Sequence, residues 1–152
     1  RLYDMHHPEI PALSHYVPAH EGPEDALAKR FPLQLITWKG KNRANSTQYA
    51  NPWLIEAQQQ KLWINPQDAQ QRGIAQGDAV RIHNARGVCE IPAEVTPRII
   101  PGVVAMQAGA WWQPDERGVD KGGCANVLSS ARITALAKGN SHQTMLVEVA
   151  KA

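Results

Sequence analysis

Short apolar stretches, separated by polar and by glycine- or proline-rich segments, run through most of the chain. Their alternating or wholly apolar character predicts strands at residues 33–38, 62–64, 79–83, 88–95, 102–106 and 145–149. A tight turn signal at residues 84–87 predicts a hairpin between the third and fourth of these strands. Many short strands with few and brief helices indicate a mainly β protein, and we expect a closed barrel.

Helical segments are predicted to be short. The clearest one begins with Asn65 as N-cap and Pro66 at the first helical position, and it ends at Gly73. A helical turn is expected after Asn51, and a brief helical piece over residues 125–131. Between residues 109 and 123 the chain is rich in glycine and lacks regular periodicity. A loop of this length inside a compact domain is usually functional.

Residues 1–30 differ from the rest because they contain Pro8, Pro11, Pro18 and Pro23. Prolines at this density exclude a continuous helix or central strand, so we expect an extended connector at 1–30 and a barrel domain at 31–152. The histidines in this segment lack the spacing of a helical metal-ligand pair, and we interpret them as surface residues. Since the first residue is Arg1, we expect the chain to be a piece of a longer protein.

Composition narrows the class of protein. The chain has 152 residues, and a hydrophobic content of 43% is enough for one core. No window approaches the ~18 apolar residues of a membrane span. Two cysteines are too few for a disulfide framework. Cys89 alternates with apolar neighbours and is expected in the core, whereas Cys124 lies in a glycine-rich turn and is expected to be exposed.

Charge is distributed unevenly along the chain. No acidic residue lies between Asp25 and Glu56, and none lies between Lys121 and Val147. If the fold brings these two windows together, they form a positive surface suited to phosphate or nucleic acid. The alternative is that 14 acidic residues scattered over 152 positions leave such gaps by chance.

Several short motifs occur in a fixed order between residues 31 and 150. They are LIT at 35–37, RANST at 43–47, LWINP at 62–66, GAW at 109–111 and GGCANVL at 122–128. In this order the motifs resemble those of the molybdopterin dinucleotide-binding domain of the dimethyl sulfoxide reductase family. The tracts at 119–128 and 136–140 are similar to those of the anaerobic dimethyl sulfoxide reductase catalytic chains and their paralogues. The resemblance implies a double-psi β-barrel related in fold to aspartate decarboxylase.

The resemblance also implies a function. It identifies the chain as the C-terminal cofactor-binding domain of a molybdenum oxidoreductase of the S-oxide or N-oxide reductase type. The implied cofactor is molybdopterin guanine dinucleotide in its bis form (bis-MGD) with molybdenum. The metal's protein ligand is then expected in an earlier domain, so this chain is expected to contain no catalytic residue and no metal ligand.

Further expectations follow from the resemblance for the surroundings of the domain. The implied partners are the preceding domains of the same chain, an iron–sulfur electron-transfer subunit and a membrane anchor subunit, with no nucleic acid. The resemblance also allows an iron–sulfur cluster elsewhere in the parent chain. The implied setting is anaerobic respiration in the periplasm.

The candidate site begins where the strand at 33–38 ends. A dinucleotide presents a pyrophosphate and polar heterocycles, which require cations, backbone amides and short polar side chains. The end of the strand and the loop that follows it supply candidates of this kind: Thr37, Trp38, Lys39, Lys41, Asn42, Arg43, Asn45, Ser46 and Thr47. By resemblance, Thr37, Arg43, Ser46 and Thr47 match the family's cofactor loop. Asn45 departs from it, because the family usually has His there.

A second group of candidates comes from later in the chain. Trp111 is suited to stacking on a heterocycle, and the amide of Asn126 to pairing with a heterocycle edge. The alternatives are core packing for Trp111 and Trp112, which we prefer for Trp112, and helix capping for Asn126. His142 and Gln143 lie where the family's chain often returns to the pterin.

The sequence does not exclude two other classes of function. One is a free-standing double-psi barrel that binds protein or nucleic acid through a basic face. The other is a small hydrolase, for which the serine candidates are Ser129-Ser130, Ser14-His15 and Ser141-His142. No third group is ordered around these serines, so the hydrolase is disfavoured. The long proline-rich connector favours the domain of a larger enzyme over a free-standing module.

Overall fold

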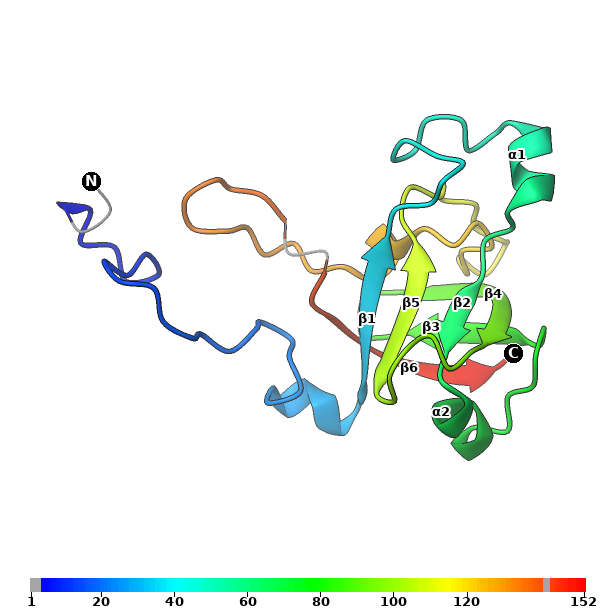
Figure 1. Ribbon diagram of the computed structural model, residues 1–152, viewed down its shortest axis with the longest axis horizontal. Helices are drawn as coiled ribbons and strands as arrows, with labels where there is room; N and C mark the ends of the chain where they lie inside the picture. The colour runs from blue at the N-terminus through cyan, green and yellow to red at the C-terminus, as the bar shows by residue number, and fades with distance from the viewer. Residues whose placement is uncertain (1–3, 141–142) are drawn as a thin grey trace.

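The fold is a closed six-stranded barrel, shown in Figure 1. The computed structural model describes residues 4–140 and 143–152. The strands are β1 (Leu33–Trp38), β2 (Leu62–Ile64), β3 (Ala79–His83), β4 (Val88–Val95), β5 (Val103–Gln107) and β6 (Met145–Lys151). Each lies within a residue or two of the predicted stretch, so the mainly β barrel is confirmed.

The strand order around the barrel is β1-β5-β2-β4-β3-β6. β1 pairs in parallel with β5, and β2 pairs in parallel with β4. β3 and β4 alone are neighbours both in sequence and in the barrel, through the predicted hairpin. This interleaved order of two parallel pairs confirms the expected double-psi β-barrel.

The barrel interior is filled by alternate side chains of its strands. On β1, Leu33 and Leu35 are buried while Ile36 between Leu35 and Thr37 is exposed. Because side chains alternate along a strand, Thr37 continues the inward row beyond the last buried leucine. The core cluster includes Leu62, Ile64, Val80, Ile82, Cys89, Ile91, Val104, Met106, Met145 and Val147. The predicted core position of Cys89 is therefore confirmed.

Within residues 4–140 and 143–152, two α-helices and two 3-10 helices lie around the barrel. α1 (Pro52–Ala57) and α2 (Pro66–Gln71) both have the predicted Asn-Pro start. In each, the side chain of the asparagine N-cap accepts a hydrogen bond from the backbone amide two residues later. η3 (Ala125–Leu128) is a single 3-10 turn and ends before the predicted 131. η2 (Ala26–Lys29) was not predicted. It fits between Pro23 and Pro32, and the Asp25 side chain caps it by accepting from the Leu27 amide at 2.9 Å.

A buried ion pair attaches the segment before β1 to the barrel. Glu21 is 2% exposed and forms an ion pair with Arg86 of the β3–β4 hairpin at 2.7 Å. The boundary between connector and barrel at residue 31 stays a prediction. Within residues 4–140 and 143–152, no helix combines the length and the apolar character needed to cross a membrane.

Candidate functional site

The two loops that contain most of the candidate residues lie at one end of the barrel. β1 and β5 are parallel, and Thr37 and Trp38 pair with Met106 and Gln107. Parallel neighbours finish at the same edge, so the loop after β1 (residues 39–50) and the loop after β5 (residues 108–124) leave the barrel together (Figure 1). We call these the β1 loop and the β5 loop.

The backbones of the two loops are in direct contact. Gly109 has φ of 89°, and a Cβ at this position would lie 1.8 Å from the carbonyl oxygen of Asn45. Only glycine permits both this conformation and this approach. The indole Nε1 of Trp111 donates to the Ser46 carbonyl at 3.0 Å, and the Ala108 amide donates to the Trp38 carbonyl at 2.9 Å.

A cavity of about 110 Å³ lies between the two loops and η3. Its lining residues are Thr37, Ser46, Ala108, Gly109, Ala110, Cys124, Ala125 and Asn126. We call it the loop cavity. Three sequence-predicted candidates, Thr37, Ser46 and Asn126, thus meet around one hollow although they lie up to 89 positions apart in the sequence.

Gln143 also belongs to this group. The Thr37 amide donates to Gln143 Oε1 at 2.9 Å, and Gln143 Nε2 donates to Thr37 Oγ1 at 2.7 Å. The segment before β6 is therefore held against the end of β1. His142 lies outside the described residues.

Arg43 lies partly buried within the β1 loop. Its Nη2 donates to Gln60 Oε1 at 2.9 Å, and its guanidinium lies 4.9 Å from the ring centroid of Tyr49. Its Nη1 is buried and has no hydrogen-bond partner among the described residues. Burial lowers the pKa of Arg43, but an arginine remains a cation at neutral pH. The site thus contains a charged donor with free hydrogen-bonding capacity.

The other residues of the β1 loop divide into two kinds. The Asn42 side chain is used within the protein, because it donates to the Leu54 carbonyl at 2.9 Å and accepts from Gln107 Nε2 at 2.8 Å. Lys39 donates to Asn45 Oδ1, so the residue at the family's usual His position contacts a lysine. Lys41 and Thr47 are exposed at the surface of the loop.

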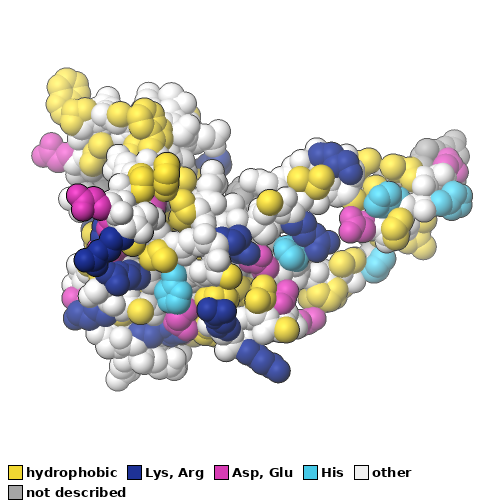
Figure 2. All heavy atoms as spheres, turned by 180° about the vertical axis from the view of Figure 1, so that it is seen from behind, with side chains coloured by type: hydrophobic (Ala, Val, Ile, Leu, Met, Phe, Trp, Pro, Cys, Tyr) yellow, Lys and Arg dark blue, Asp and Glu magenta, His cyan; other side chains and the backbone are white. Residues whose placement is uncertain are grey.

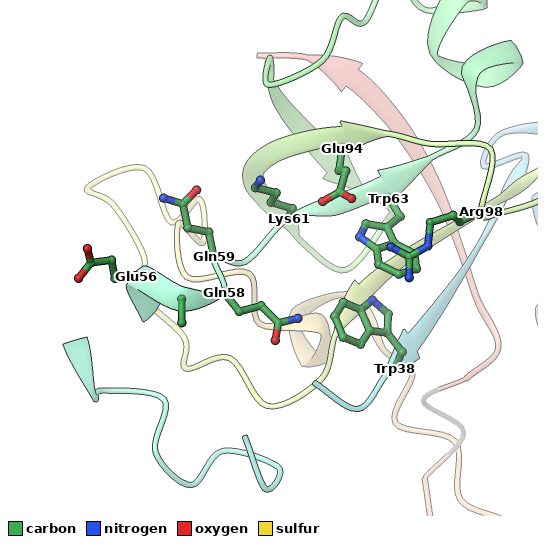
Figure 3. Close-up of a pocket in the computed structure, with 9 residues that line it drawn as sticks. Trp38, Glu56, Gln58, Gln59, Lys61, Trp63, Glu94 and Arg98 are labelled. Carbon is green, nitrogen blue, oxygen red and sulfur yellow. The ribbon is translucent and has the colours of Figure 1, made fainter. Parts of the chain in front are cut away.

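Trp38 is separated from the loop cavity. It follows Thr37 on β1, so its side chain points to the outer face of the barrel. There its ring centroid lies 5.0 Å from that of Trp63, and the Arg98 guanidinium lies 4.3 Å from the Trp63 centroid (Figure 3). These side chains line a different hollow of about 310 Å³ beside α1. Trp38 therefore does not share the loop cavity with Thr37, Ser46 and Asn126.

The structure decides against helix capping by Asn126 and against core packing of Trp112. Asn126 does not cap η3, because the N-cap position is Cys124 and no side chain caps this turn. Trp111 is 50% exposed, and Trp112 is 62% exposed. The preference for core packing of Trp112 was wrong, because the β5 loop turns away from the barrel interior at this point.

Neither cysteine has the properties of an activated nucleophile. Burial raises the pKa of the Cys89 thiol, with a further contribution from the nearby Asp120 carboxylate. Burial also raises the pKa of Cys124, which is half-buried at the loop cavity and less exposed than its glycine-rich surroundings indicated. Thiols with raised pKa values are mostly protonated at neutral pH and react slowly.

Sequence reasoning missed two residues that build the site. Asp120 is fully buried, and its carboxylate accepts from the amides of Gln113, Gly122 and Cys124 at 2.7, 3.2 and 2.7 Å. An acidic residue two positions before a Gly-Gly pair was the available signal for such a turn. Gln60 connects Arg43 to the carbonyls of Gln107 and Gly123. Nothing distinguishes Gln60 in sequence from its neighbours Gln58 and Gln59.

The two acid-free windows do not form one positive surface. Lys121 forms ion pairs with Glu90 at 2.7 Å and Asp115 at 3.6 Å. Arg132 lies 3.6 Å from Glu9. Acidic residues from elsewhere in the chain therefore pair with two cations of the second window, Lys121 and Arg132, and the basic face needed by the alternative function is not supported.

The structure does not assemble a hydrolytic or metal centre from its described residues. The Ser129 hydroxyl donates to the Asn126 carbonyl at 3.0 Å, and the His15 ring faces the Leu13 carbonyl at 3.2 Å. Across residues 4–140 and 143–152, no three His, Cys, Asp or Glu side chains gather as a metal site would require.

Comparison with known proteins agrees with this architecture. Residues 33–146 match the family described as the Molydopterin dinucleotide binding domain. Over 143 residues the chain is 52% identical to the dimethyl sulfoxide reductase DmsA of Escherichia coli, covering 93% of this chain and 17% of that protein. It is 39% identical over 135 residues to a trimethylamine-N-oxide reductase of Haemophilus influenzae, covering 82% of this chain and 16% of that one.

A solved structure shares the fold at low sequence identity. Acetylene hydratase from Pelobacter acetylenicus superimposes with a TM-score of 0.74 at 15% identity, covering 99% of this chain and 22% of that one. The chain spans about a sixth of the length of the curated relatives named above. From the match over nearly the whole barrel, the chain belongs to the Molydopterin dinucleotide binding domain family.

Proposed function

We propose that this chain is the C-terminal cofactor-binding domain of the catalytic subunit of a molybdenum oxidoreductase that reduces S-oxides or N-oxides. The cofactor held at the loop cavity is molybdopterin guanine dinucleotide. One observation carries the assignment: the β1 and β5 loops bring Thr37, Ser46 and Asn126 together around one cavity, and the β1 loop also contains Arg43 with an unpaired buried donor. A sequence identity of about 50% to proteins named dimethyl sulfoxide reductases supports this assignment.

The residues present fit such a group. Three buried polar side-chain atoms have no hydrogen-bond partner among the described residues: Trp38 Nε1 on the outer face of the barrel, Arg43 Nη1 and Gln107 Oε1. Arg43 and Gln107 both contact Gln60, so a free donor and a free acceptor lie in the same network. Buried polar groups are normally hydrogen-bonded, and a ligand with phosphate oxygens and heterocycle N–H groups offers partners for both.

Each of the main candidate side chains has a role that its chemistry allows. Arg43 supplies the charge that a pyrophosphate requires, and Lys41 adds a second cation at the surface of the same loop. The Asn126 amide presents a donor and an acceptor suited to a heterocycle edge. The half-exposed Trp111 offers a face for stacking, while its Nε1 fixes the ring to Ser46.

When bound, the molybdenum centre supplies two-electron oxygen-atom transfer. The task of this chain is to bind and orient the organic part of the cofactor. The loop cavity is lined by oxygen and nitrogen donors, small apolar side chains and one protonated thiol, a set that suits the dinucleotide and not the metal itself.

The wider assembly follows from the resemblance to the anaerobic dimethyl sulfoxide reductases. The parent chain works with an iron–sulfur electron-transfer subunit and a membrane anchor subunit, and it acts in the periplasm during anaerobic respiration. Fractionation of cells that express the parent protein tests the location. Co-purification under mild detergent tests the two subunits.

Metal and nucleotide analysis of the purified parent protein tests the proposed function. The expected result is molybdenum together with guanine nucleotide released by acid. In the Arg43→Gln variant both contents fall several-fold, whereas Arg117→Gln, in an exposed turn of the β5 loop, leaves them unchanged. Absence of molybdenum, another base in place of guanine, or an Arg43→Gln variant loaded like the wild type would contradict the assignment.

A further inference from the structure

Among the described residues, no carboxylate pairs with the half-buried Arg43. Figure 2 shows Lys and Arg side chains beside Asp and Glu side chains at several places on one face of the molecule. Ion pairs with carboxylates are formed by four other arginines: Arg72, Arg81, Arg86 and Arg132. A half-buried cation without a counterion is suited to an anionic ligand. The surroundings of Arg43 therefore decide how its charge is presented.

Gln60 connects Arg43 to the β5 side of the barrel through both ends of its amide. Its Oε1 accepts from Arg43 Nη2 at 2.9 Å. Its Nε2 donates to the Gln107 carbonyl at 2.8 Å and to the Gly123 carbonyl at 3.0 Å. Backbone carbonyls can only accept hydrogen bonds, so the amide nitrogen must face them and the oxygen must face the guanidinium. The backbone at the end of β5 and in the β5 loop thus fixes which end of Gln60 meets Arg43.

The β5 loop is shaped for this contact. A Cβ at Gly123 would lie 2.4 Å from Gln60 Cγ, and Gly123 has φ of 80°, so this position requires glycine. On another side of Arg43, the guanidinium lies 4.9 Å from the ring centroid of Tyr49, whose hydroxyl donates to the Gly122 carbonyl at 3.0 Å. Two side chains that donate to consecutive carbonyls of the β5 loop therefore hold Arg43.

The chemistry of an amide suits this position better than that of a carboxylate. A glutamate at residue 60 would form an ion pair with Arg43 and compete with any anionic ligand for it. The neutral oxygen of Gln60 fixes Nη2 and leaves the positive charge uncompensated. Nη1 is buried and has no partner among the described residues, so the free donor is held in one direction. A donor that is already ordered loses less conformational entropy when a ligand binds.

We propose that Gln60 is a positioning residue for Arg43: it holds the guanidinium so that Nη1 and the positive charge are presented to the phosphate groups of the bound dinucleotide. This rests on the proposed function, which supplies the phosphate groups. Gln60 acts through Arg43 and needs no contact of its own with the cofactor.

Chemical labelling of Arg43 tests this role without the cofactor. The full parent protein is purified from cells that cannot make the molybdenum cofactor and is treated with phenylglyoxal, which condenses with the terminal nitrogens of a guanidinium. Mass spectrometry measures the modification rate of Arg43. In Gln60→Ala we expect a rate several-fold higher than in wild type, because Nη2 loses its partner.

Gln34→Ala is the matched control for the labelling. Gln34 is also half-buried, and its Nε2 donates to a backbone carbonyl, that of Met145, at 3.2 Å, but it lies near the start of β1, at the opposite end from the β1 loop. We expect the wild-type rate at Arg43 in this variant. Equal rates in Gln60→Ala and Gln34→Ala would overturn the proposal.

Nucleotide retention tests the same role in the loaded parent protein. Guanine nucleotide is measured after dialysis in a double-mutant cycle of Gln60→Ala and Arg43→Gln. Because Gln60 acts through Arg43, Gln60→Ala should lower the retained nucleotide several-fold in the wild-type background and have no further effect in the Arg43→Gln background. A residue that only stabilises the loops would lower retention by the same factor in both backgrounds, and that result would overturn the proposal.

The two measurements separate this proposal from the proposed function. Faster labelling of Arg43 in Gln60→Ala, in a parent protein that contains no molybdenum or guanine nucleotide even when cofactor-producing cells make it, would support the positioning role and reject the cofactor assignment. A loaded protein in which Gln60→Ala changes neither the labelling rate nor the retention would reject the positioning role alone.

Discussion

Thr37 and Gln143, 106 positions apart, exchange two hydrogen bonds at the end of β1. One of them uses the Thr37 backbone amide, which lies beyond the last strand pairing of Leu35 with Met145. The pair therefore extends the contact between β1 and the segment before β6 to the edge of the loop cavity. Thr37 lines that cavity, so the position of its side chain depends on Gln143.

Removing the Gln143 side chain should loosen this edge. Gln143→Ala leaves the Thr37 amide without its partner and is expected to lower the free energy of unfolding by about 1 kcal/mol. Thr37→Val removes the hydroxyl and keeps the amide hydrogen bond, so its effect is expected to be smaller. Urea unfolding of both variants measures the difference. Equal stability of Gln143→Ala and wild type would show that the pair does not hold the two segments together.

The contact between the two loops depends on Gly109. Gly109→Ala forces a Cβ against the Asn45 carbonyl and is expected to cost about 1–3 kcal/mol of overpacking, in addition to about 1–2 kcal/mol for the left-handed backbone. Gly118→Ala is the matched control, because Gly118 has φ of 78° and no atom within 4 Å of the added Cβ. Only the backbone cost applies to it. Chemical denaturation that finds the two variants equally stable would disprove the close approach.

The buried carboxylate of Asp120 holds the β5 loop in shape. In Asp120→Asn, an amide nitrogen replaces one of the two oxygens that accept backbone N–H groups, so at least one amide loses its partner. The expected loss is about 2–3 kcal/mol. Asp115→Asn, at a half-exposed carboxylate in the same loop, should change stability far less. Thermal unfolding of the two variants compares them, and a neutral Asp120→Asn would contradict this role.

Thiol reactivity reports on the loop cavity. Alkylation requires the thiolate, and the pKa of Cys124 is raised by burial, so iodoacetamide should label it slowly at pH 7 and faster as the pH rises beyond the ordinary thiol range. Cys89 should react only after unfolding, because it is fully buried. Bound cofactor should protect Cys124. If the labelling rate of Cys124 is already at its maximum at pH 7, its thiol is activated instead.

Much of the barrel was predictable because its determinants are local. The alternation on β1, the Asn65-Pro66 start of α2 and the 84–87 turn each specify an element within a few residues. The outward position of Trp38 follows from the same alternation on β1, although its neighbours in the loop motif suggested the cofactor side. Its packing against Trp63 was not predictable in this way, because it depends on how distant strands are arranged in the barrel.

The network behind the candidate site depends on contacts between distant segments. Gln60 joins Arg43 to the β5 strand and to Gly123 across separations that no local pattern encodes. The pairing of Lys121 with Glu90 is of the same kind, because it depends on how the β5 loop folds back on β4. Charge windows in the sequence could not reveal that these cations already have partners.

Hydrogen–deuterium exchange on the full parent protein shows whether the cofactor binds at the β1 and β5 loops. The protein is purified from cells that make the molybdenum cofactor and from cells that cannot, and exchange is compared over this domain. If the cofactor binds at the loop cavity, cofactor-dependent protection is confined to residues 37–47, 108–126 and the segment at Gln143, and residues 4–20 and α2 are unchanged. Protection at the hollow beside Trp38 and Trp63 instead, or no difference at the β1 and β5 loops, would contradict it.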